Sequence, residues 1–314
     1  MQILHPKKSW AGAYSKEGGD DVHIKPSFGE RTFDVFNVVL MILIAIACFY
    51  PMWYVIINSL NDAQDAMRGG IWLWPRIFSL ESMRAVLSNS AIGNAFIITI
   101  ARTILGTFLA IFFTAMVSYP LSKPELAGRK FYFIMGMITM FFSGGLIPTF
   151  LLFRDLNLLN NFWVFIIPAM FSFFNVLIFS AFFRTIPQSV EESAKMDGAN
   201  DFTVFLRIIL PLSKPVLATL ALFAAVHHWN DYFTGIMFIT NNDLEPLQTL
   251  LFRIISESGA AQMQVAAANI IARETTTTSI RMATMVVATV PIILVYPFLQ
   301  KYFIKGMLIG AVKE

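Results

Sequence analysis

Six polar or aromatic residues adjoin one another near the end of a long apolar stretch, and they are His227, His228, Trp229, Asn230, Asp231 and Tyr232. Imidazole groups could bind a transition metal, but adjacent histidines of a helix point to different faces and no third ligand is nearby. His227, Asn230 or Asp231, and Thr234 recur at helical spacing, so they would share one face. We therefore expect no metal site, and a polar face that lines a translocation path or forms hydrogen bonds between subunits.

Three side chains in apolar stretches each leave two interpretations open. Arg102 is charged, and a charge at membrane depth costs about 2.5–3.5 kcal/mol to insert, so it should face protein or water. It either bridges to a carboxylate or carbonyl of this chain or a partner, or lines a pore. Trp229 and Tyr232 either stack on a sugar ring or pack against lipid. Arg102 lies close to one helical face together with Thr99, Thr103, Gly106, Thr114 and Ser118.

A polar segment between two apolar stretches has the signals of two short helices joined by a sharp turn. Ser189 with Glu192 three residues later forms a capping box, which would begin the first helix. Gly198 stands where a left-handed residue would end that helix, and Asn200 or Asp201 can cap the second. A simple connection would not need two capped helices. We expect an amphipathic knob that enters a groove on a partner. One side of the second helix should carry Phe202, Phe205, Leu206 and Ile209.

The composition is that of a membrane protein without catalytic machinery. Apolar residues make up 56% of the 314 residues and charged residues only 14%, against about 25% charged residues in soluble domains. The sequence has no Walker-type phosphate loop, no Gly-x-Ser-x-Gly element and no zinc-binding motif. Net charge is +3 and no basic run is interleaved with aromatic residues, so nucleic acid is not an expected partner.

A spanning helix needs about 20 mostly apolar residues. Six segments qualify, namely Asp34–Ser59, Ile92–Ser118, Phe131–Phe153, Phe162–Phe183, Pro215–Ile239 and Ile280–Leu299. The predicted fold is an all-α membrane protein with six transmembrane helices and a cytoplasmic helical loop between the fourth and fifth. Residues 1–32 would be a cytoplasmic N-terminal tail, 33–299 the six-span domain with the loop at 184–212, and 300–314 a cytoplasmic C-terminal tail.

The distribution of charge predicts the orientation. Most of the 23 Lys and Arg residues lie in the tails and in the loops on the same side, so both termini should be cytoplasmic. Of the outer segments, one carries Trp72 and Trp74 beside a proline, which predicts an aromatic anchor at the headgroup level. Another includes Leu247–Ile255, with apolar residues at the spacing of an amphipathic helix.

The loop resembles the EAA motif of inner-membrane permeases in bacterial ABC importers, which reads E-A-A-x3-G-x9-I-x-L-P. This chain has Glu192-Ser193-Ala194, three residues, Gly198, nine residues and Ile208-Ile209-Leu210-Pro211, and departs only at Ser193. Asp197-Gly198-Ala199, and Leu210-Pro211 with Pro215, resemble the carbohydrate-uptake, maltose-transporter-like branch. Further matches include Phe142–Pro148 and Trp229–Asp231, and the resemblance covers nearly everything after Phe33.

The resemblance implies a permease subunit of an ATP-driven, binding-protein-dependent importer for sugars, with oligosaccharides, including acidic polysaccharide fragments, as the expected cargo. The implied partners are a second related permease, two ATPase subunits, an extracytoplasmic solute-binding protein and the bacterial plasma membrane. ATP and Mg would bind the ATPase, and this chain would bind no cofactor and catalyse nothing. The residues expected to dock on the ATPase are Glu191, Glu192, Ser193, Ala194, Asp197, Gly198, Ala199, Phe202, Phe205, Leu210 and Pro211. The candidate translocation path is Arg102, Ser143, Gly144, His227, Trp229, Asn230, Asp231 and Tyr232.

Two alternatives remain at this point. The first is the same machine with a non-sugar solute. The second is an ion-coupled secondary transporter, which should show internal repeats, interrupted helices and intramembrane carboxylates. Asp231 is the only deep carboxylate candidate, and such a transporter would not need a docking loop.

Overall fold

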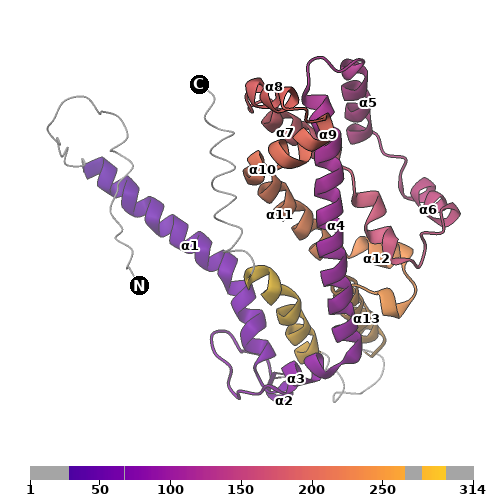
Figure 1. The fold of residues 1–314 in the computed structure, drawn as a ribbon. Coiled ribbons are helices and arrows are strands. Elements are labelled where there is room, and N and C mark those ends of the chain that lie inside the picture. The colour runs from indigo at the N-terminus through magenta and orange to yellow at the C-terminus, as the bar shows by residue number, and fades with distance from the viewer. Residues whose placement is uncertain (1–27, 67, 266–277, 295–314) are drawn as a thin grey trace. The chain divides into compact units, whose positions relative to one another are not determined.

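The structure is a computed structural model that describes residues 28–66, 68–265 and 278–294, with side chains described up to residue 256 of the middle range (Figure 1). Over these ranges the regular structure is helical, apart from one isolated antiparallel bridge between Asn61 and Phe78. The predicted all-α fold is confirmed. Of the predicted tails, 300–314 and residues 1–27 lie outside the described residues, and residues 28–32 are helical.

The helices follow one another along the chain with short connections. The first part comprises α1 (Phe28–Ser59), α2 (Ala63–Ala66), α3 (Glu81–Ser88), α4 (Ser90–Ser122), α5 (Arg129–Phe141), α6 (Leu146–Asp155), the 3₁₀ turns η2 (Phe162–Phe165) and η3 (Ile167–Ala169), and α7 (Phe173–Phe183). The second comprises α8 (Gln188–Met196), α9 (Asp201–Val204), the π-helical turn η4 (Phe205–Ile209), α10 (Leu210–Leu212), α11 (Lys214–Asn230), α12 (Phe233–Phe238), the 3₁₀ turn η5 (Asn242–Leu244), α13 (Leu247–Val265) and a last helix, Thr278–Leu294.

The contacts divide the chain into two units inside α1, after Pro51. The described part of the first unit, from Phe28 to Pro51, is one helix that is mostly apolar after Asp34 and whose side chains are exposed except for the half-buried Tyr50. A helix that is apolar all round and exposed is what a lipid environment requires. The helix as a whole is long and apolar enough to cross a membrane.

The central helix of the second unit is α4, which packs mainly against α11 and α7 (Figure 1). Its buried face repeats every three or four residues and includes five of the six residues predicted to share a face, namely Thr99, Arg102, Gly106, Thr114 and Ser118, whereas Thr103 is half-buried. Small side chains on this face let the neighbouring helices approach closely. At Gly106 a Cβ atom would lie 2.5 Å from the His228 ring of α11, so only glycine fits there without a shift.

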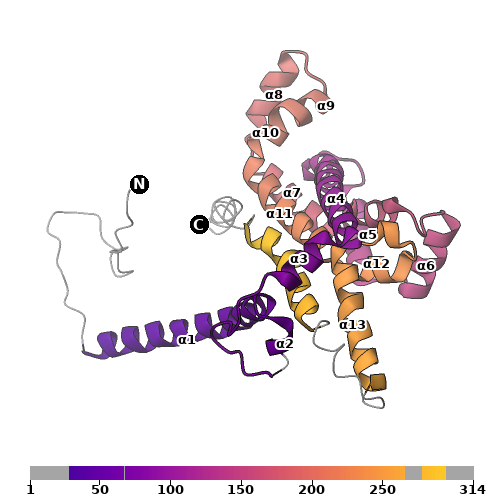
Figure 2. The same ribbon diagram turned by 90° about the horizontal axis from the view of Figure 1, so that it is seen from below.

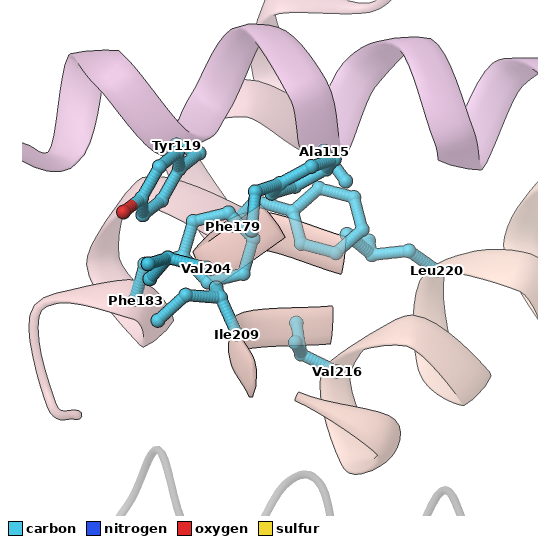
Figure 3. Packing of buried hydrophobic residues seen from close by; sticks show 9 residues of the cluster. Ala115, Tyr119, Phe179, Phe183, Val204, Ile209, Val216 and Leu220 are labelled. Carbon is cyan, nitrogen blue, oxygen red and sulfur yellow. The ribbon is translucent and has the colours of Figure 1, made fainter. Parts of the chain in front are cut away.

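The largest apolar cluster joins α4, α7 and α11 to the predicted loop (Figure 3). Its buried members are Ala115, Tyr119, Phe179, Phe183, Val204, Phe205, Ile209, Val216 and Leu220. The second helix of the loop therefore belongs to the core of this unit.

Three of the predicted spans are not single straight helices. α5 and α6 meet at 111°, so the continuous helix predicted over Phe131–Phe153 is wrong. The bend falls at Ser143-Gly144-Gly145, where Gly145 has φ +84°, a left-handed conformation that glycine adopts without strain. The fourth predicted span begins as 3₁₀ turns that meet α7 at 48°. In the fifth, α11 ends at Asn230 and α12 starts after Tyr232.

Length and composition of the described helices allow two membrane spans, or up to five if each bent pair is one span. The predicted sixth span is represented by the short apolar helix Thr278–Leu294, and its residues 295–299 lie outside the described residues. In the predicted outer stretch, the helix expected over Leu247–Ile255 is present as part of α13.

Candidate functional site

The predicted loop forms two helical stretches near the C-terminal end of α4. The first is α8, and the second is the run of α9, η4 and α10 (Figure 2). The predicted capping box is wrong. α8 begins at Gln188, directly after Pro187, and its first turn has no side-chain cap. Ser189 is already inside the helix, and its carbonyl oxygen accepts a hydrogen bond from the Ser193 hydroxyl at 2.8 Å. The fixed φ of Pro187 favours a start at Gln188, two residues too early for Ser189 to act as the cap.

The turn between the two helices has the predicted geometry. Gly198 has φ +86°. Its N–H donates to the Lys195 carbonyl at 3.0 Å, and the Ala199 N–H donates to the Ala194 carbonyl at 3.0 Å. These two bonds make a Schellman motif, which closes a helix through a left-handed glycine. The Asn200 side chain then accepts from the Thr203 N–H at 2.8 Å and caps α9.

The second helix does not present all four predicted apolar residues on one side. Phe205 and Ile209 are buried in the core cluster, whereas Phe202 is 56% and Leu206 37% exposed. The π turn η4 begins at Phe205 and adds a residue to its helical turn, so the α-helical spacing assumed for Leu206 and Ile209 does not hold there. Phe202 is thus the one of the two predicted phenylalanine anchors that remains at the surface.

Glu191 is the only buried residue of α8. Its side chain is 7% exposed, and its Oε2 accepts a hydrogen bond from the Tyr119 hydroxyl at 2.9 Å. The same oxygen pairs with the Lys123 ammonium, which also lies 4.8 Å from the centre of the Tyr119 ring. We call this group of three residues the Glu191 latch. It was missed in the sequence, because spacing alone does not tell which of two adjacent glutamates turns inward.

The opposite face of α8 is open. Glu192 is exposed and has no hydrogen-bond or ion-pair partner among the residues that the structure describes, and Met196 is 88% exposed. Lys195 pairs with Asp201 of α9 at 2.7 Å, and this hydrogen bond raises the pKa of Lys195 above its ordinary value. The exposed predicted docking residues are Glu192, Ser193, Asp197, Gly198, Phe202 and Pro211, and the buried or half-buried ones are Glu191, Ala194, Ala199, Phe205 and Leu210.

Arg102 forms a bridge within the chain. Its side chain is fully buried, one terminal nitrogen lies 3.5 Å from the Asp231 carboxylate, and the other bonds the Asp231 backbone carbonyl. The guanidinium carbon also lies 5.0 Å from the centre of the Phe165 ring. Asp231 in turn accepts from the Thr234 N–H at 3.1 Å, which starts α12. The bridge to a carboxylate and a carbonyl that was one interpretation of Arg102 is present within this chain, and it ends at Asp231, the residue that follows α11.

The other residues of the histidine-containing segment and of the predicted path differ in their burial and in their contacts. His228 is buried against Gly106, whereas His227 is exposed. The Trp229 indole donates to the Ala288 carbonyl at 3.2 Å, and the Tyr232 ring stacks on Phe252 at 5.0 Å, so both are held by this chain. Asn230, Ser143 and Gly144 are exposed, the last two in the α5–α6 break. Because α11 ends at Asn230, the predicted polar face does not continue to Thr234.

Comparison with known proteins identifies the family. Residues 93–309 match the family described as binding-protein-dependent transport system inner membrane component. The chain belongs to this family. The permease is 38% identical over 283 residues to the polygalacturonan/rhamnogalacturonan transport system permease protein YtcP of Bacillus subtilis, an alignment that covers 90% of this chain and 99% of the relative. It is also 38% identical over 288 residues to the protein LplC of the same bacterium. This alignment covers 90% of this chain and 95% of LplC.

A solved structure agrees with this assignment. A chain of a bacterial ABC transporter involved in the import of the acidic polysaccharide alginate matches with a TM-score of 0.80 and 31% identity, over 89% of this permease and 99% of that chain. The family resemblance inferred from the loop is confirmed. Permeases of this family are non-catalytic membrane components, and separate subunits hydrolyse the ATP.

Proposed function

We propose that this permease is one of two membrane subunits of an importer for acidic oligosaccharides. Two relatives support the cargo, since the YtcP system is named for polygalacturonan and rhamnogalacturonan, and the solved transporter imports alginate. Polygalacturonan and alginate share a chemistry, because both are chains of sugar rings that carry carboxylates. A non-sugar solute has no comparable support, and an ion-coupled transporter does not agree with the family.

For the spans and the other subunits of the transporter, the proposal keeps what the family resemblance implies. The permease would cross the bacterial plasma membrane six times, with both termini in the cytoplasm, and pair with a second permease. Two ATPase subunits would bind ATP and Mg, and an extracytoplasmic binding protein would deliver the sugar. The carrying observation is the open face of α8, where Glu192 has no ion-pair or hydrogen-bond partner among the described residues, next to the turn that Gly198 closes. A short helix of this kind fits a groove on the ATPase.

Transport would proceed by alternating access. ATP binding closes the ATPase dimer, the α8 loop moves with it, and the spans reopen toward the outside. Of the predicted path residues, Ser143, Gly144, His227, Asn230 and Tyr232 are exposed, whereas Arg102 and Asp231 hold the helices that frame the path.

The test is ATP-driven uptake into proteoliposomes that contain the whole transporter and its binding protein. The cargo would be oligogalacturonate, and the matched control would be the same oligomer with its carboxyl groups reduced to alcohols. We expect uptake of the acidic oligomer to be at least about tenfold faster, because a site built for a carboxylate leaves its polar groups unpaired with the reduced analogue. Equal uptake of both would refute the acidic cargo, and the absence of ATP-driven uptake of any sugar would refute the proposed function.

A further inference from the structure

The attachment of α8 to the rest of the chain is unusual for a surface helix. Amphipathic helices normally bury an apolar stripe. In α8 the one buried side chain is a carboxylate, Glu191, and the nearest apolar contribution is the half-buried Ala194. Ionised side chains are rarely buried unless they are paired and hydrogen-bonded. The carboxylate of Glu191 is paired with Lys123 and hydrogen-bonded to Tyr119, so it can be buried as a charged group.

The partners of Glu191 are themselves fixed. Tyr119 is buried in the core cluster. The centre of its ring lies 5.5 Å from the ring centre of Phe205 in η4 and 6.4 Å from that of Phe183 in α7. Lys123 follows one turn later, directly after the last residue of α4. The Glu191 carboxylate therefore joins α8 to α4, beside the apolar contact that Ala194 makes with the core cluster.

We propose that the Glu191 latch is the positioning contact that transmits the movement of α8 to α4. A charged hydrogen bond is directional and strong, whereas an apolar contact between helices can slide. With one polar anchor, α8 can tilt relative to α4 without losing its connection to that helix. This inference rests on the proposed docking of α8 and adds the path by which docking reaches the spans.

Glu191→Gln tests the latch with little change in shape, because the amide keeps an oxygen for the Tyr119 hydroxyl and loses only the charge that pairs with Lys123. We expect the sugar imported per ATP hydrolysed to fall about fivefold, in line with the loss of one charged contact. Binding of the ATPase should stay within about twofold of wild type, because the Glu191 side chain, although predicted to dock, is buried against Tyr119 and does not lie on the exposed face of α8. The matched control is Glu192→Gln on the open face, which should instead weaken ATPase binding.

A charge swap separates positioning from general damage. Glu191→Lys alone places two ammonium groups together and should abolish coupled uptake. Glu191→Lys with Lys123→Glu restores opposite charges and should recover at least about half of the uptake per ATP. Normal uptake per ATP in Glu191→Gln, no rescue by the swap, or loss of ATPase binding in Glu191→Gln would each overturn the latch. Failure of the wild-type transporter to import sugar would instead count against the proposed function.

Discussion

At the scale of single residues, two buried charges among the described residues, Arg102 and Glu191, pair with residues far away along the chain. Arg102 and Asp231 are separated by 129 positions and connect α4 to the break between α11 and α12. A buried charge whose partner is removed costs about 3–5 kcal/mol, whereas an exposed pair contributes about 0–1 kcal/mol. Burial therefore decides which pair matters for stability.

Asp231→Asn should lower the free energy of unfolding of the detergent-solubilised transporter by about 3 kcal/mol, because the guanidinium of Arg102 would lose its neutralising charge. The control is Asp155→Asn, which removes the partner of Arg154 in a pair whose side chains are 58% and 65% exposed. That control should change stability by less than about 1 kcal/mol. Denaturation followed by tryptophan fluorescence measures both, and similar small losses in the two variants would contradict the structural role of Arg102.

The sequence could identify these residues but not their partners. Arg102 was recognisable because a charge in an apolar run needs an explanation. Its bridge to Asp231 could not be chosen over pore lining, since that requires knowing that α4 lies beside the end of α11. In the same way, Glu191 and Glu192 are indistinguishable by composition, and only the position of Tyr119 shows which one turns inward.

At the scale of the elements, α4 and α11 cross at a contact that depends on one glycine. The Gly106 site lies against the His228 ring, and an added Cβ would meet that ring at 2.5 Å. Gly93, in the same helix, has no heavy atom within 4 Å of the corresponding position. The two glycines therefore form a matched pair for a packing test.

Gly106→Ala should destabilise the permease by about 1–3 kcal/mol, because the buried imidazole must shift to make room. Gly93→Ala should be neutral or stabilising by up to about 1 kcal/mol, since alanine favours a helix over glycine. Thermal unfolding of the two purified variants, compared with wild type, measures the difference. A Gly106→Ala variant as stable as Gly93→Ala would show that α4 and α11 are not packed in this way.

The helices themselves were predictable to the extent that periodicity and caps specify them. The turn at Gly198 and the cap at Asn200 follow from local chemistry, and both are present. The 111° bend after Phe141 and the π turn at Phe205–Ile209 were not predicted. A count of apolar residues measures the length of a stretch and does not detect a change of direction within it.

At the scale of the whole molecule, the two faces of α8 have different roles. The inner face is held by the Glu191 latch, and the outer face carries the exposed Glu192 and Met196. The family and the all-helical fold were predicted from the loop motif and the apolar runs, and both are confirmed. The number of spans and the partner that covers α8 stay predictions, because they depend on a membrane and on other subunits.

The most direct test of the central claim places a photo-crosslinking benzoylphenylalanine at Met196, the last residue of α8, in the assembled transporter. The control carries the same group at Leu156, which is 58% exposed at the end of α6. Irradiation should join the permease to the ATPase from position 196, with a yield that changes when ATP is added, and should give no ATPase adduct from position 156. Equal ATPase adducts from both positions, or none from position 196, would contradict the docking of α8 on the ATPase.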